Sequence, residues 1–177
     1  MWSLLVAGVV VALAATVVAA WLRETRPPSA RQSFDTPVAI PQAPALTADE
    51  ERFAATLWGV HREATRSAVA MSFAGITYET EGRDARTLAA KIAPLAKLFQ
   101  DAETRVRTMS VPASLVKTHS QYVEAVALYA KAADEMLKFT QDGDTQHLAA
   151  AHKMDVSASE DMLRVGEMLW PGQYKPH

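Results

Sequence analysis

Apolar and polar positions follow three different patterns along this chain, and each pattern predicts a different kind of segment. The first pattern is an unbroken apolar run from Leu4 to Leu22, which is 19 residues without a charged side chain. A helix of that length spans roughly 28 Å, close to the thickness of about 30 Å of a bilayer's hydrocarbon core. The run therefore predicts that residues 1–22 form a single transmembrane anchor.

Two other interpretations of the apolar run stay open. Val18-Ala19-Ala20 fits the cleavage site of a signal peptide, although no Lys or Arg precedes the run and it exceeds the usual apolar length of about 7–15 residues. A short buried helix would need a partner domain large enough to cover it on all sides. Trp2 and Trp21 stand at the two ends of the run, where amphipathic rings favour the membrane interface, and this favours the anchor.

The second pattern covers residues 23–46, which are rich in proline and alanine. Five of the nine prolines fall here, and because proline removes a backbone donor and fixes φ, we expect an extended linker. In one interpretation the linker is a spacer. In another it is a strap that lies on a partner subunit, because Phe34, Val38 and Ile40 are apolar side chains that a solvated spacer does not need.

The side of the membrane on which the folded domain lies is a separate question. The positive-inside rule places Arg23 and Arg26 in the cytoplasm, but Glu24 offsets this small charge bias. A short apolar run, a linker and then a folded domain is the usual layout of an exported, tethered domain. We therefore expect a single-pass protein of the bacterial inner (cell) membrane with a periplasmic domain.

The third pattern begins at Thr47 and places apolar residues at spacings of three and four, as on one face of an α-helix. The helices are expected over about residues 48–79, 84–108, 112–141 and 145–169. No segment after residue 47 alternates like a strand. Long helices joined by short turns pack most simply as an antiparallel up-down-up-down bundle. The fold class is therefore all-α, with a four-helix bundle over residues 47–170 and a C-terminal tail over residues 171–177.

Residue types at the expected helix ends agree with this division. Thr47 and Glu50 have the form of a capping box, and Asp144 is a good N-cap for the last helix. Pro112 is expected at the first position of the third helix. Pro94 predicts a kink near residues 90–94 or a division into two shorter helices. The residues expected to face inward are Phe53, Leu57, His61, Ala64, Ala68, Met71, Gly75, Leu88, Ile92, Leu95, Phe99, Ala102, Val106, Leu115, His119, Tyr122, Val126, Tyr129, Ala133, Leu137, Leu148, Ala151, Asp155, Ala158, Met162, Val165 and Leu169.

Composition removes several classes of function. The formal net charge is −2, from 18 Lys and Arg against 20 Asp and Glu, and a nucleic-acid-binding protein needs a basic face instead. There is no Cys, which excludes disulfides, thiolate metal sites, iron–sulfur clusters and covalently attached haem. Neither a nucleophile elbow nor a P-loop nor a dinucleotide-binding glycine motif occurs in the sequence, so we expect no catalytic residues.

The histidines offer little metal chemistry. No pair has the spacing of a zinc or di-iron motif, and His147 and His152 are five residues apart, which separates them by about 140° around a helix. We therefore expect neither a metal site nor a cofactor. The one candidate worth naming is a non-covalent haem held between Met71 and either His147 or His152, because the end of the first helix would lie beside the start of the fourth.

Aromatic residues provide the remaining candidates. His119 and Tyr122 share the inner stripe of the third helix and form either a small polar pocket or the margin of the core. Trp58, Trp170 and Tyr174 are interface anchors in one interpretation, and a Trp that closes one end of the core in another. Together with Trp2, Trp21, Phe34, Val38 and Ile40, they are the candidate partner contacts.

These features favour a non-enzymatic role. We expect a membrane-anchored helical bundle that acts as an accessory or scaffold subunit of a larger respiratory, photosynthetic or envelope complex. Its expected partners are the lipid bilayer and other subunits of that complex, without nucleic acid and without a small-molecule ligand. The alternative is a membrane-tethered module that binds a ligand or senses one, which resembles in outline the sensor domains of bacterial chemoreceptors.

Overall fold

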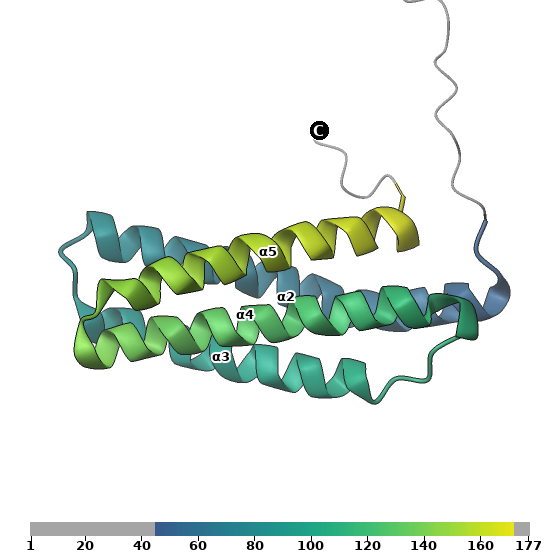
Figure 1. The fold of residues 1–177 in the computed structure, drawn as a ribbon, viewed down its shortest axis with the longest axis horizontal. Coiled ribbons are helices and arrows are strands. Elements are labelled where there is room, and N and C mark those ends of the chain that lie inside the picture. Colours follow the sequence, from purple (N-terminus) through teal and green to yellow (C-terminus); the bar gives the residue numbers. More distant parts are fainter. Residues whose placement is uncertain (1–44, 172–177) are drawn as a thin grey trace, which may run out of the picture. The chain divides into compact units, whose positions relative to one another are not determined.

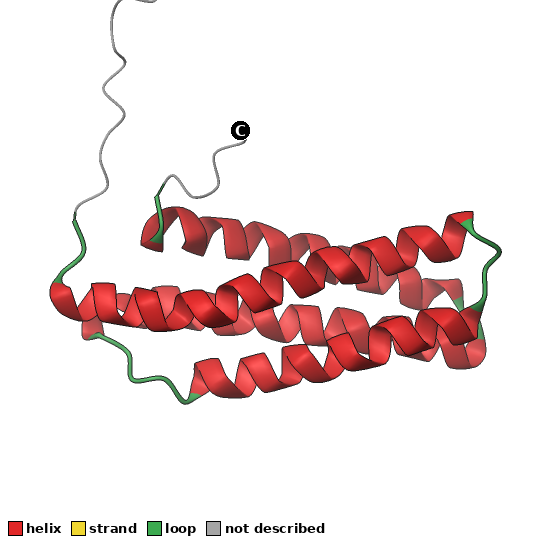
Figure 2. Cartoon of the chain, turned by 180° about the vertical axis from the view of Figure 1, so that it is seen from behind, coloured by secondary structure: helices red, strands yellow, loops and turns green. Residues whose placement is uncertain are grey.

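The domain is entirely helical in the computed structural model, which describes residues 45–171. The helices are α2 (Ala48–Thr80), α3 (Ala85–Arg107), α4 (Val116–Asp142) and α5 (Thr145–Leu169), and a 3₁₀ turn at Ala113–Leu115 precedes α4. No strand occurs among these residues. Consecutive helices run in opposite directions along a common long axis (Figures 1 and 2). The predicted all-α class and the four helices are confirmed.

Local chemistry explains where the helices begin and end. The Thr47 backbone N–H donates to Glu50 Oε2 at 2.7 Å, and the Glu50 backbone N–H donates to Thr47 Oγ1 at 3.4 Å, so the predicted capping box is present. The Asp144 carboxylate caps α5 by accepting from the Gln146 N–H at 2.9 Å. Gly143 ends α4 at φ 75°, a left-handed conformation that glycine adopts without strain.

The division of the second helix at Pro94 and the helical position of Pro112 need correction. Pro94 does not divide α3, which runs unbroken from Ala85 to Arg107. Both Pro94 and Ala90 are exposed, so the carbonyl that loses its donor stays open to water. Pro112, in contrast, is not helical, because its ψ of 142° is extended and α4 begins only at Val116, after the 3₁₀ turn that buries Leu115.

The core lies where the helical periodicity places it. Most of the residues expected to face inward are buried. The exceptions are only partly buried, and they are Gly75, Leu95, His119, Leu137, Leu148 and Asp155. The four helices do not pack equally closely, however. α4 packs tightly against both α3 and α5, with Ala125, Ala132 and Ala133 fully buried, and the small size of these side chains lets the helices approach each other.

The α2–α5 seam is the loosest part of the bundle. α2 packs mainly against α3, and the backbones of α2 and α5 approach each other at far fewer positions than those of α4 and α5. Side chains fill the space between α2 and α5 only in part. Two mainly apolar hollows lie along the seam.

Several predictions fall outside the described residues. These are the anchor over residues 1–22, nearly all of the linker over residues 23–46, and most of the tail. The candidate contacts in these segments are Trp2, Trp21, Phe34, Val38, Ile40 and Tyr174. Between residues 45 and 171, no helix combines the length and the apolar character needed to cross a bilayer.

Candidate functional site in the seam between α2 and α5

Two hollows lie along the α2–α5 seam. The distal hollow is nearer the α4–α5 turn, has a volume of about 480 Å³, and is lined by α2, α4 and α5 through residues that include Met71, Met136 and Leu148. The proximal hollow is nearer Trp170, has a volume of about 420 Å³, and is lined by residues that include Val69 and Leu163. Both linings are mainly apolar, so the seam is suited to an apolar occupant.

A polar contact crosses the seam between the two hollows. The Ser72 hydroxyl on α2 lies 3.1 Å from Asp155 Oδ2 on α5, and 3.1 Å from the Ala68 carbonyl oxygen on its own helix. Ser72 and Asp155 each line both hollows. Their contact therefore marks the boundary between the hollows.

The carboxylate of Asp155 is the most unusual group in the seam. Its Oδ1 atom is buried and has no hydrogen-bond partner among residues 45–171. Burial raises the pKa of Asp155, while the Ser72 hydroxyl and the charge of His152 act in the opposite direction. A buried carboxylate oxygen without a donor costs free energy, so this site favours a ligand that brings a donor or a positive charge.

An exposed apolar stripe runs along α2 beside the proximal hollow. Val69, Phe73 and Ile76 follow a helical spacing of four and three, and their exposed fractions are 53%, 63% and 58%. All three also line the proximal hollow, and we name them the α2 stripe. Leu163 on α5 faces the same hollow and is 48% exposed. Contiguous exposed apolar residues next to a groove are typical of a binding surface.

Aromatic rings close the proximal end of the seam. The Trp58 ring stacks on the His61 ring at a centroid distance of 5.6 Å, and Trp170 lies 4.9 Å from Trp58 and 4.7 Å from His61. His61 is almost fully buried, and burial lowers its pKa to about 4. Trp58 and Trp170 were predicted as partner contacts; the structure places them in contact with each other, half-buried, and their contact with a partner stays a prediction.

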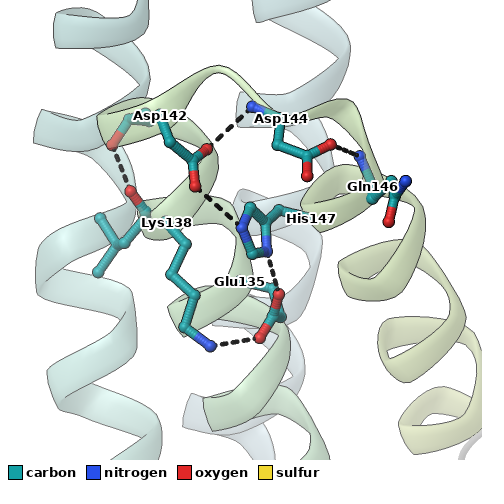
Figure 3. A network of polar contacts seen from close by, with 8 residues as sticks. Glu135, Lys138, Asp142, Asp144, Gln146 and His147 are labelled. Atoms are coloured by element: carbon teal, nitrogen blue, oxygen red, sulfur yellow. Dashed lines mark hydrogen bonds and ion pairs between the residues drawn. The ribbon is translucent and has the colours of Figure 1, made fainter.

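His147 lies away from the seam hollows, in a polar network at the α4–α5 turn (Figure 3). Its Nδ1 lies 2.5 Å from Glu135 Oε2, and its Nε2 lies 3.1 Å from Asp142 Oδ2. Glu135 also accepts from Lys138 Nζ at 2.6 Å. The hydrogen bond with Glu135 is the main cause of a raised pKa for His147. Both ring nitrogens are therefore engaged within the turn, and His147 is not placed to serve as a haem ligand opposite Met71.

Met71 and His152, in contrast, line the same distal hollow. Their pairing makes a haem worth testing against the other lining groups. No Lys or Arg lines this hollow to pair with haem propionates, whereas Glu79 and Asp155 both do and would repel them. The lining therefore fits a haem poorly. Across the described part of the chain, no group of three or more His, Asp or Glu side chains is arranged to hold a metal ion.

The structure does not bring His119 and Tyr122 together in either seam hollow. His119 Nε2 lies 2.9 Å from the Val106 carbonyl oxygen near the end of α3, and its ring contacts Phe53 edge-on. Tyr122 is fully buried, and burial raises the pKa of its hydroxyl. The contacts of His119 agree with its interpretation as part of the margin of the core, whereas Tyr122 lies inside the core and its hydroxyl has no hydrogen-bond partner among the described residues.

The comparison with known proteins assigns no relative. The chain matches no protein-family model, and no match is found among curated proteins or among solved structures. The function is therefore argued from the seam and from the sequence alone.

Proposed function

We propose that this protein is a non-enzymatic, membrane-tethered subunit that scaffolds a larger membrane complex, and that it holds its partner through the α2 stripe. The observation that carries the proposal is the exposure of Val69, Phe73 and Ile76 beside a groove that is itself mainly apolar. Fully burying one such side chain contributes about 1.5–3 kcal/mol. Three adjacent side chains and the groove wall are a fitting seat for an apolar face of a partner helix.

The remainder of the chain supports a membrane tether and a non-enzymatic role. The apolar run of residues 4–22 is long enough to cross a bilayer once and would hold the bundle next to other membrane subunits. The layout of run, linker and domain favours a periplasmic location at the inner membrane. The full sequence contains no nucleophile elbow, P-loop or dinucleotide-binding motif, which supports a role in binding rather than catalysis.

The proposal is tested with the full-length chain in its native membrane. After extraction in a mild detergent, native electrophoresis measures the size of the complex that contains the protein. We expect the wild type to migrate in a large complex and the double variant Phe73→Ser and Ile76→Ser to be released from it, because both changes remove apolar area that the partner buries.

A matched control comes from α4. Val116 is 56% exposed, similar to the α2 stripe, and it lines neither seam hollow, so Val116→Ser should leave the complex intact. A wild-type protein that migrates alone would contradict the scaffold role. A complex that survives the double variant but not Val116→Ser would place the interface elsewhere and overturn the role of the α2 stripe.

A further inference from the structure

We infer that the distal hollow binds a small amphiphilic amine, with its apolar body in the hollow and its ammonium group on Asp155. This site goes beyond the proposed scaffold role, because it needs no partner protein. It also departs from the expectation that the chain binds no small-molecule ligand. The inference rests on the size of the hollow, on its apolar wall and on the buried Oδ1 of Asp155, which has no hydrogen-bond partner among residues 45–171.

The hollow has the size and surface of a site for a small ligand. Its volume of about 480 Å³ lies within the range of about 300–1,000 Å³ that is common for such sites. Met71, Met136 and Leu148 supply a flexible apolar wall. Gly75 and Ala151 supply the space, because their side chains do not reach across the seam. A Cβ atom at Gly75 would meet Met136 Cε at 3.5 Å, an ordinary contact, so the Met136 methyl group lies close to the backbone of α2 at this point.

The charges around the hollow select a cation. Asp155 lines the hollow, and its buried Oδ1 lacks a hydrogen-bond partner among the described residues. The other carboxylate in the lining, Glu79, already pairs with Arg83 at 3.0 Å. No Lys or Arg lines the hollow, and His152, which does line it and acts on Asp155, is exposed to solvent, so Asp155 remains the carboxylate to which an incoming ammonium is attracted. Hydrogen bonds between charged groups are the strong ones, and an ammonium at this carboxylate would compensate an oxygen that has no partner among the described residues.

The same charges exclude other occupants of similar shape. A fatty acid would place its carboxylate against Asp155, and like charges at short range repel in a partly buried site. A zwitterionic lipid headgroup carries an ammonium but also a phosphodiester, which Glu79 and Asp155 both disfavour. A neutral alcohol can donate one hydrogen bond but brings no charge. A free amine with a short alkyl or aryl body fits both the wall and the charge.

Methyl groups inside the hollow give a direct readout of binding. The protein has seven methionines, and two of them, Met71 and Met136, line the distal hollow. The full-length chain, labelled with ¹³C at the methionine methyls and held in lipid nanodiscs, is titrated with hexylammonium. We expect saturable shifts of the Met71 and Met136 signals, with Met109 and Met168 as internal references outside the hollow. Hexanoate and hexanol at equal concentration are the matched probes. Neither should shift the Met71 and Met136 signals as much as hexylammonium does.

Two variants separate the charge from the cavity. Asp155→Asn keeps the size of the side chain and should raise the Kd for hexylammonium about tenfold or more, because the charged hydrogen bond is lost. Gly75→Leu fills the hollow and should weaken binding without changing the charge. Glu160→Gln, an exposed carboxylate on α5 outside the hollow, should leave the Kd unchanged. The resolved methionine spectrum of each variant shows that it is folded.

The outcomes decide between the alternatives. Equal binding of hexanol would make the hollow a purely apolar site and overturn the role of Asp155, as would an unchanged Kd in Asp155→Asn. Binding of hexanoate would overturn the charge argument. Absence of shifts at Met71 and Met136 with all three probes would overturn the site itself. None of these outcomes depends on the complex measured by native electrophoresis, so the scaffold proposal stands or falls separately.

Discussion

The two sides of this bundle are built from similar residues but are packed to different degrees. Where α4 meets α3 and α5, fully buried alanines bring the helices close, and Phe99 stacks on Tyr129 at a centroid distance of 5.2 Å. Across the α2–α5 seam, large apolar side chains are exposed and two hollows remain. The first side accounts for stability, because it buries apolar area. The second side leaves apolar area unburied, and this is the area that a partner or a ligand can still cover.

Two phenylalanines provide the sharpest test of this difference. Phe99 in α3 is 0% exposed, whereas Phe73 in α2 is 63% exposed. Phe99→Ala should lower the free energy of unfolding by about 3–5 kcal/mol, because it leaves a cavity in a packed core. Phe73→Ala should change it by about 0.5 kcal/mol or less, because the side chain is already in water. Guanidinium unfolding followed by circular dichroism measures both.

The matched pair also shows how the comparison could fail. A large loss of stability in Phe73→Ala would mean that the seam is covered within the free protein, and the α2 stripe would no longer be available to a partner. A small loss in Phe99→Ala would mean that the α3–α4 side relaxes easily. Either result would remove the contrast between a packed side and an open one.

A second test concerns the closed end of the seam. Burial lowers the pKa of His61 to about 4, below its usual value of 6.5. Between these two pH values the unfolded chain binds a proton that the folded chain excludes, so stability should fall as the pH drops from about 6.5 to about 4 and change little above 6.5. The loss due to His61 is about 3 kcal/mol on the scale of 1.36 kcal/mol per pKa unit.

The contribution of His61 is isolated by a difference between variants. His61→Phe keeps a ring against Trp58 and Trp170, and it should lose less stability than the wild type between pH 7 and pH 4.5. Identical pH dependence in His61→Phe and the wild type would show that water reaches His61 and that the proximal end of the seam is open.

Sequence reasoning succeeded for features that depend on neighbouring residues. The capping box at Thr47 and the N-cap at Asp144 each follow from a few residues in a row. The buried stripes follow from the helical period in the same way. These features are local, so a single sequence contains nearly all the information that determines them. The prediction that Pro112 begins a helix was wrong, because the 3₁₀ turn after it depends on how Leu115 reaches the core.

The candidate site could not be predicted in this way. The seam contact between Ser72 and Asp155 joins residues 83 positions apart, and its existence depends on how closely α2 approaches α5. Two signals were nevertheless present. Asp155 is a charged residue on a stripe that is otherwise apolar, and Phe73 and Ile76 are apolar residues off the predicted stripe of α2. Such residues, which break the pattern, are expected at binding sites.

The smallest expected effect concerns His147, at the turn that joins the closely packed α4 and α5. Hydrogen bonding to Glu135, with further help from Asp142, raises the pKa of His147 above 6.5. The effect of pH on stability is opposite to that of His61. The stabilisation due to His147 is complete below about pH 6.5 and is lost as the pH rises through the pKa of His147 in the folded protein. The side chains of the network are partly exposed, so solvent reduces the effect on stability. A proton NMR titration of the His147 ring should give a pKa above 6.5 that falls in Glu135→Gln and not in Glu124→Gln, an exposed carboxylate elsewhere on α4.

If the pKa of His147 is unchanged in Glu135→Gln, the turn is held by its Asp142 and Asp144 caps alone. The geometry of the closely packed side of the bundle would then depend on side-chain packing and not on this charge network.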